Sequence, residues 1–223
     1  MNSLISTLSA FISPTAVHLP AVPQITESHC GPAVLELALS FIGKKVAQED
    51  VVTAAKVKKR IMKHGMLPSQ LALAVEKLAP DVKFWFSHPA TNEDLNALLH
   101  KYHWPVIVNW QGLFYDTLEE EMVHNPDGEH GHYSIVVDLD MAKDQIVISD
   151  PYPEYASKYR TFSFEWFETR WWDVDHIISK KNGKLHSWYT KRLMMVITPQ
   201  DATFPAKIGM KTFEEFKMLK SKK

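Results

Sequence analysis

Helical patterns come first along this chain and strand patterns dominate after them, and this order restricts the fold more than any other feature. Apolar residues at helical spacing predict a helix that follows Cys30 and ends near Gly43. Further helices are predicted over 48–59, after Pro68, and from Thr91, a good N-cap with an acidic residue three positions later.

Strand patterns are rich in β-branched and aromatic residues and are bounded by turn residues. The segments that fit this description are Val82–Phe86, Pro105–Trp110, His132–Asp140, Gln145–Asp150 and Arg192–Thr198. A polar turn over 141–144 joins the third segment to the fourth and predicts a hairpin. The chain is therefore predicted to be α+β, with a helical half packed on a mainly antiparallel sheet.

The length of 223 residues fits one large domain better than two small ones. We expect an N-terminal arm or short helix over 1–20, the folded domain over 21–205, and a C-terminal tail or helix over 206–223. Hydrophobic residues make up 45% of the chain and charged residues 23%, a balance that supports a sizeable core.

The charge balance excludes several classes of partner. Lys and Arg number 25 against 26 Asp and Glu, so nothing favours nucleic acid or an anionic membrane surface. No apolar run is long enough for a membrane span. The first basic side chain other than histidine is Lys44, so the typical start of a secretory signal is missing. We expect a cytoplasmic location, with export without a typical signal as the alternative, and the sequence indicates no oligomeric state.

The only cysteine, Cys30, lies in the stretch VPQITESHCGPA at 22–33, directly before the predicted helix. One cysteine excludes an internal disulfide and a multi-cysteine zinc site. A helix N-terminus favours the thiolate, which is the nucleophilic form, and Gly31 leaves room beside the sulfur for a substrate carbonyl. The alternative is a buried cysteine that acts as a small apolar residue, the commonest fate of a lone cysteine.

His132 opens the first strand of the predicted hairpin and Asp150 closes the second. The start of one strand lies beside the end of the other in an antiparallel hairpin, so the two side chains should be neighbours. Asp150 is then placed to accept a hydrogen bond from one ring nitrogen and to direct the other at a thiol. Each residue alone also has a structural interpretation, but together with Cys30 they favour catalysis.

Gln24 lies six residues before Cys30, on the loop that enters the helix. Its side-chain amide is a candidate donor for an oxyanion in the same pocket. The alternative is a solvated loop glutamine.

The segments VPQ…CGPA, GHYSIVVDLD and ISDP resemble the papain-like cysteine peptidases that process bacteriocin leaders, the double-glycine peptidase family, and their stand-alone relatives. The resemblance runs from Val22 to Pro151 and implies a papain-like fold. It also implies that Gln24 is the oxyanion donor, Cys30 the nucleophile, His132 the base and Asp150 the orienting acid.

Two features do not match that family, namely His29 and the long insert over 111–129. The 223 residues also contain no membrane or nucleotide-binding part, so the transporter role of the fused members is not implied.

The implied reaction is acyl transfer from a peptide or protein substrate through a thioester, and it needs no cofactor or metal. Two alternatives stay open. One is a non-catalytic peptide-binding module on the same fold, and the other is an acyltransferase that uses the same thiol with an amine in place of water.

Three further patterns have competing interpretations. The cluster His124, His130 and His132 suggests a metal site, but a solvated loop is the simpler interpretation. The acidic residues of the insert indicate a solvated loop, or else a lid that favours basic substrates. The aromatic residues over 164–172 indicate core packing, or else a peptide-binding wall.

Overall fold

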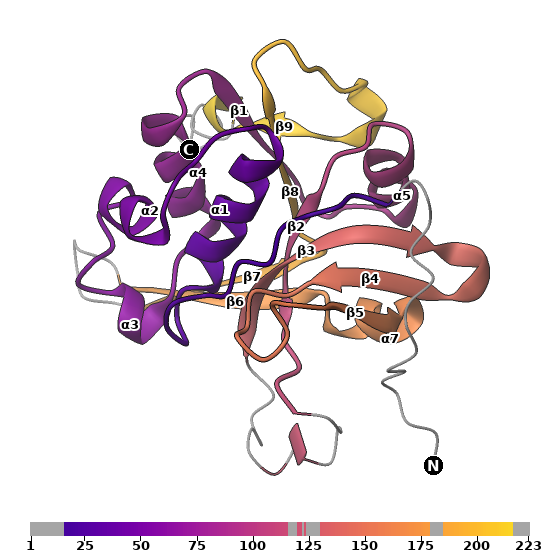
Figure 1. Ribbon diagram of the computed structural model, residues 1–223, viewed down its shortest axis with the longest axis horizontal. Coiled ribbons are helices and arrows are strands. Elements are labelled where there is room, and N and C mark those ends of the chain that lie inside the picture. The colour runs from indigo at the N-terminus through magenta and orange to yellow at the C-terminus, as the bar shows by residue number, and fades with distance from the viewer. Residues whose placement is uncertain (1–15, 116–119, 122, 124–129, 179–184, 216–223) are drawn as a thin grey trace.

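The computed structural model describes residues 16–115, 120, 121, 123, 130–178 and 185–215 (Figure 1). Within these ranges, no helix is long and apolar enough to cross a membrane. The division into an arm, a domain and a tail stays a prediction, because much of both ends lies outside the described residues.

The predicted helices are present, and they are α1 (Cys30–Phe41), α2 (Gln48–Ala54), α4 (Pro68–Leu78) and α5 (Asn92–His100). The prediction of one helix over 48–59 was wrong at its C-terminal end. The backbone turns at Lys56, which has a φ of 59°, and a separate short helix α3 (Ile61–His64) follows. The left-handed conformation of a non-glycine residue interrupts the α-helical hydrogen-bond pattern. Thr91 caps α5 by accepting a hydrogen bond from the Asp94 N–H, as predicted.

The main sheet has seven strands in the order β5-β4-β3-β2-β8-β1-β9, and every neighbouring pair is antiparallel. Its strands are β1 (Val82–Ser87), β2 (Val106–Gln111), β3 (Gly131–Asp140), β4 (Gln145–Ser149), β5 (Tyr159–Ser163), β8 (Met194–Pro199) and β9 (Lys211–Thr212). The predicted α+β class with a mainly antiparallel sheet is confirmed.

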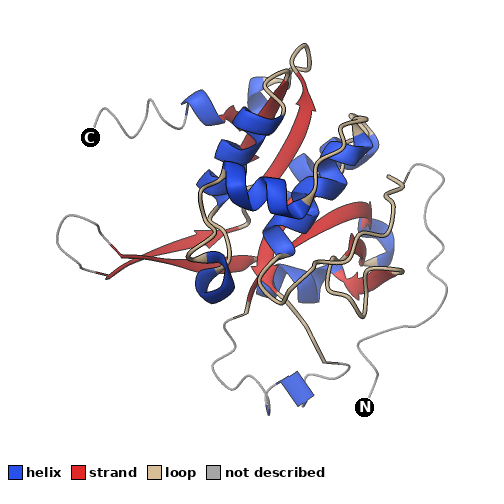
Figure 2. Ribbon diagram, turned by 60° about the vertical axis from the view of Figure 1, so that its left-hand side comes forward, coloured by secondary structure: helices blue, strands red, loops and turns tan. Residues whose placement is uncertain are grey.

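Several elements were not predicted. They are the strands β5 and β9, the helix α7 (Phe164–Arg170), and a separate two-stranded ribbon of β6 (Trp172–Ile178) and β7 (Leu185–Lys191). The ribbon extends to the left in Figure 2, away from the other strands. It also packs against β2, so its base lies next to the end of the main sheet.

Helices cover both faces of the sheet. In Figure 1, α1, α2 and α4 lie on one side of the central strands, and α5 and α7 lie on the other. The alternation of side chains along β2 produces two cores, because Ile107 packs with the α1 side and Trp110 with the α7 side. The helical half is thus attached to the sheet by a continuous apolar layer that fixes the position of the α1 N-terminus.

The aromatic segment over 164–172 belongs mainly to the second core. Phe164, Phe167 and Trp171 are buried, and Trp166 and Trp172 are only partly covered. The core-packing interpretation of this segment is therefore confirmed for its buried members, each of which contributes roughly 1.5–3 kcal/mol by leaving water.

Candidate active site

Cys30 is the first residue of α1 and is 8% exposed. The first N–H groups of a helix have no intrahelical acceptor, and they carry partial positive charge. The sulfur therefore lies in the helix-tip environment that the sequence indicated. The space beside Gly31 is already occupied, because a Cβ there would lie 3.1 Å from Leu71 and 3.4 Å from Tyr133. Gly31 thus allows close packing of the helix tip, which differs from the expected role of admitting substrate.

His29 precedes Cys30 and is buried at the N-cap of α1. Its Nδ1 hydrogen bonds with the Thr26 hydroxyl. Burial lowers the pKa of His29, although Glu49 opposes the shift. His29 is therefore held as a neutral structural residue of the loop, which explains its position beside the cysteine without a catalytic role.

His132 and Asp150 are in direct contact, as the hairpin predicted. The distance from His132 Nε2 to Asp150 Oδ1 is 2.8 Å, and both side chains are almost completely buried. His132 lies at the start of β3, and Asp150 is the residue after β4. The two strands pair in antiparallel fashion. Since Nε2 is engaged by Asp150, Nδ1 is the ring nitrogen left for another partner.

The surroundings of His132 favour its charged form. Burial alone would lower the pKa of His132, but the charge and hydrogen bond of Asp150 outweigh it. Hydrogen bonding and charge at the neighbouring Cys30 side chain add to the shift, and the pKa rises to about 10. At neutral pH the ring is therefore an imidazolium between a carboxylate and a sulfur.

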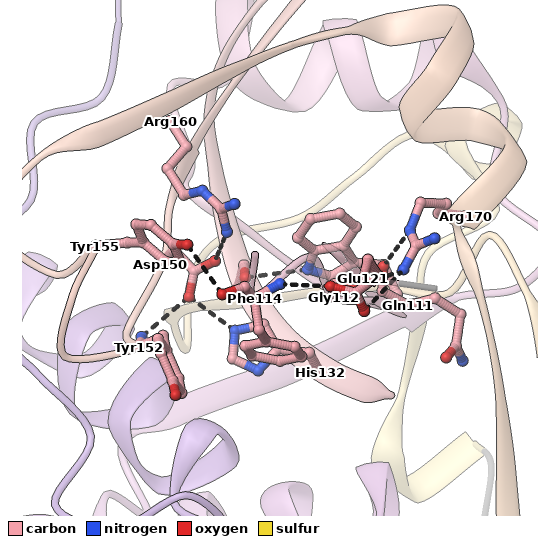
Figure 3. Close-up of polar contacts among 12 residues, drawn as sticks. Gln111, Gly112, Phe114, Glu121, His132, Asp150, Tyr152, Tyr155, Arg160 and Arg170 are labelled. Atoms are coloured by element: carbon pink, nitrogen blue, oxygen red, sulfur yellow. Dashed lines mark hydrogen bonds and ion pairs between the residues drawn. The ribbon is translucent and has the colours of Figure 1, made fainter. Parts of the chain in front are cut away.

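Arg160, the second partner of Asp150, was not predicted from the sequence. Its Nη1 donates to Asp150 Oδ2 at 2.8 Å, and the guanidinium lies 3.7 Å from the centre of the Tyr155 ring. The backbone N–H of Tyr152 donates to Asp150 Oδ1 at 3.0 Å, so three donors surround the carboxylate (Figure 3). Burial would raise the pKa of Asp150, but His132 and then Arg160 overcome this effect and lower it.

The insert after β2 covers His132 with an aromatic ring. Phe114 packs edge-on against His132 with ring centres 5.0 Å apart. The Phe114 N–H donates to Glu121, and its carbonyl accepts from the Tyr155 hydroxyl (Figure 3). The expectation of a solvated acidic loop is wrong for Glu121, which is buried and paired with Arg170.

Other acidic residues of the insert, Asp116 and Glu119, lie outside the described residues, as does His124. Among the residues that the structure describes, no group of three His, Cys, Asp or Glu side chains could hold a metal ion.

Gln24 is buried in the loop before α1, and its backbone N–H donates to the Pro151 carbonyl at 2.7 Å. This bond connects the loop to the residue that follows Asp150. Its side-chain amide donates to the carbonyls of Thr26 and Glu27, and its Oε1 is buried without a hydrogen-bond partner in the described part of the chain. Both amide hydrogens are therefore used within the loop. This differs from the prediction that the amide faces the pocket.

A cavity of about 390 Å³ opens beside Cys30. Its buried walls include Asn109, Tyr133, Asp173 and Asp175, and its more exposed wall comes from the segment 60–65. Cys30 lines this cavity and His132 does not. A second, largely apolar cavity of about 220 Å³ lies between α4, β1 and β7 and does not include Cys30.

The arrangement of a helical half on an antiparallel sheet, with the single thiol at the helix tip and an imidazole at the sheet end, is that of papain-like cysteine peptidase domains. A model of the Peptidase_C39 like family matches residues 17–177. The match covers well over half of the sequence, and the chain belongs to the Peptidase_C39 like family. The resemblance seen in the sequence is confirmed.

A solved structure shows the same fold. The peptidase domain of Streptococcus ComA, a bi-functional ABC transporter involved in a quorum sensing pathway, matches with a TM-score of 0.54 and 21% identity. That match covers 82% of this chain and 100% of the ComA domain. A double glycine motif protease from an AMS/PCAT transporter, in complex with the leader peptide, matches with a TM-score of 0.49 and 15% identity, covering 85% of this chain and 97% of that one. A comparison with curated proteins found no match.

Replacing Arg160 should destabilise the fold strongly. Arg160→Met leaves the buried Asp150 carboxylate without its guanidinium partner, and breaking a buried pair costs about 3–5 kcal/mol. The control is Lys44→Met, which removes an exposed ion pair with Asp81 and should cost at most ~1 kcal/mol. Denaturant unfolding of the three proteins measures both losses, and equal losses would contradict the structural role of Arg160.

Stability should depend on pH through His132. The pKa of His132 is about 10 in the folded protein and about 6.5 when unfolded. Folding therefore favours the protonated ring, and the contribution of His132 is fully present below about pH 6.5 and lost as the pH rises towards 10. The difference in unfolding free energy between wild type and His132→Ala should be constant in acid and shrink across this range. A difference that grows with pH would contradict the raised pKa.

Proposed function

We propose that this protein is a cysteine peptidase in which Cys30 is the nucleophile, His132 the general acid and base, and Asp150 the residue that orients His132. The observation that supports this most strongly is the buried His132–Asp150 pair at 2.8 Å, which directs an imidazolium at the only thiol in the chain. A cation beside a sulfur at a helix tip favours the thiolate, the form that attacks carbonyl carbon.

The acylation step uses these groups in order. The Cys30 thiolate attacks the carbonyl carbon of the substrate, a C–S bond forms, and the electron pair moves to the carbonyl oxygen. The imidazolium of His132 then donates its Nδ1 proton to the leaving nitrogen, the C–N bond breaks, and a thioester remains. The Cys30 backbone N–H is the nearest helix-tip donor for the oxyanion.

Hydrolysis of the thioester reverses the proton path. Neutral His132 takes a proton from water, the hydroxide attacks the thioester carbon, and the C–S bond breaks. The products are a carboxylic acid and the original thiolate–imidazolium pair. Asp150 keeps its charge throughout because Arg160 and the Tyr152 N–H hold it.

Gln24 is proposed as the second oxyanion donor. Its amide must then exchange one of its carbonyl acceptors, Thr26 or Glu27, for the substrate oxygen. The occupied amide is the one observation that favours a non-catalytic peptide-binding module on the same fold.

The substrate class that fits is a peptide or protein, because the cavity beside Cys30 is open and lined by both polar and apolar groups. We place the activity in a reducing compartment such as the cytoplasm, because the thiol must stay unoxidised.

The sole cysteine makes the nucleophile easy to test, because Cys30 is the only thiol that iodoacetamide can alkylate. At about pH 6 an ordinary thiol is almost entirely protonated, so Cys30 should react at least ~10-fold faster than a model thiol. His132→Ala should remove this advantage, and the exposed His18→Ala should keep it.

Cleavage of a peptide mixture, followed by mass spectrometry, extends the test to turnover. Cys30→Ala should abolish cleavage, and His132→Ala should lower it by ~10²-fold or more. A Cys30 that reacts no faster than the model thiol would overturn the peptidase proposal. Fast labelling without cleavage of any peptide would favour the binding module.

Gln24→Ala separates an oxyanion role from a purely structural one. Loss of one oxyanion donor should lower kcat by ~10²–10³-fold, while the alkylation rate of Cys30, a reaction that forms no oxyanion, should change only a few-fold. If both rates fall together, Gln24 acts only by holding the loop.

A further inference from the structure

The cavity beside Cys30 has two buried aspartates on one wall. Asp173 and Asp175 are two residues apart on β6, so their side chains point to the same side of the ribbon. Both line the cavity that Cys30 also lines, and they are 9% and 8% exposed. Both belong to the unpredicted ribbon and not to the acidic insert.

Asp173 is already engaged by neutral amides. Asn109 Nδ2 donates to its Oδ2 at 2.7 Å, and Gln111 Nε2 donates to its Oδ1 at 3.2 Å. These bonds from β2 fix the Asp173 carboxylate in position.

Two acceptor atoms in the same cavity have no hydrogen-bond partner among the described residues. One is Oδ2 of Asp175, and the other is Oδ1 of Asn109, a residue that is only 1% exposed. A buried acceptor without a donor is unfavourable. When Asp175 is charged both atoms are acceptors, so a single ligand that satisfies both must offer at least two N–H or O–H donors.

No ion pair in the described ranges includes Asp175. Arg60 also lines the cavity, and its charge lowers the pKa of Asp175. Its Nη2 donates to the His64 carbonyl at 3.2 Å, and its Nε is buried without a hydrogen-bond partner among the described residues. Lys63 is exposed to solvent. The wall that carries Asp173 and Asp175 is therefore the acidic side of this cavity.

The raised pKa of Asp175 agrees with a carboxylate that lacks an ion-pair partner among the described residues. Burial, followed by the charge of Asp173, raises the pKa of Asp175 to about 7, and Arg60 opposes this shift. An entering cation would stabilise the carboxylate form and replace the proton.

We propose that Asp175 and Asn109, supported by Asp173, form a subsite that binds a positively charged group, the ammonium or guanidinium of a lysine or arginine next to the scissile bond. This rests on the proposed function, because the subsite selects substrates for Cys30. A carboxylate with a neighbouring amide oxygen offers acceptors that match the several N–H donors of such a group.

Methanethiosulfonate reagents of different charge test the subsite without a known substrate. The Cys30 thiolate attacks the sulfenyl sulfur, a disulfide forms, and methanesulfinate leaves, so intact mass reports the rate. The cationic aminoethyl, neutral methyl and anionic sulfonatoethyl reagents are compared with free cysteine as the reference. The measured quantity is the ratio of the rate with the cationic reagent to the rate with the anionic reagent. We expect this ratio to be at least ~10-fold higher for Cys30 of the wild type than for free cysteine.

The near-isosteric variant Asp175→Asn should reduce this preference at least ~3-fold. The matched control is Asp201→Asn, an equal charge change at an exposed residue outside the cavity, which should leave the preference unchanged. If Asp175→Asn does not fold, Asp175→Ser serves in its place. Raising the salt to about 1 M shortens the screening length to about 3 Å and should weaken the wild-type preference as well.

The outcomes separate the two proposals. Rapid modification by all three reagents without a cationic preference, or a preference that survives in Asp175→Asn, overturns the subsite and leaves the peptidase proposal standing. A preference lost in Asp175→Asn supports the subsite even if no peptide is cleaved. A Cys30 that no reagent modifies overturns both, because the subsite requires a cavity open to the sulfur.

Discussion

The buried carboxylate of Asp150 is the charge on which the candidate site depends. An isolated carboxylate in a protein interior is very unfavourable, so its partners must stay in place for the fold to hold. Those partners are Arg160 on β5, His132 on β3, and the backbone N–H of Tyr152. The same bonds that keep the charge stable also fix the imidazole ring, so orientation of His132 follows from the stability of the sheet end.

The two halves of the fold each contribute residues to the proposed catalytic site. The helical half supplies Cys30 at the tip of α1, and the sheet supplies His132 and Asp150 at one end of the β3–β4 hairpin. The apolar layer between α1 and the sheet sets their separation, because Cys30 and Tyr133 both belong to it. A close-packed core of this kind does not adjust freely, and the alignment of sulfur and ring is therefore a property of the whole domain.

The sequence predicted what depends on local patterns. The helix behind Cys30 and the hairpin that joins His132 to Asp150 follow from periodicity, capping and turn residues within short segments. Arg160 and the β6 ribbon could not be predicted in this way, because their positions depend on pairing between distant strands. The hydrogen bonds of the Gln24 amide could not be predicted either, since they depend on the conformation of the loop and not on residue type.

Asp150 and Asp175 show how similar burial produces different behaviour. Asp150 has an arginine at 2.8 Å, and its pKa is lowered, so its charge is fixed. For Asp175, burial and the charge of Asp173 outweigh the opposing charge of Arg60, and its pKa rises to about 7. A carboxylate that orients a catalytic ring needs a permanent charge. A carboxylate that recognises a cation can lack a counterion within the protein, because the bound cation itself stabilises the charged form. The two aspartates therefore suit the two proposed tasks, because Asp150 has an ion-pair partner and Asp175 has none among the described residues.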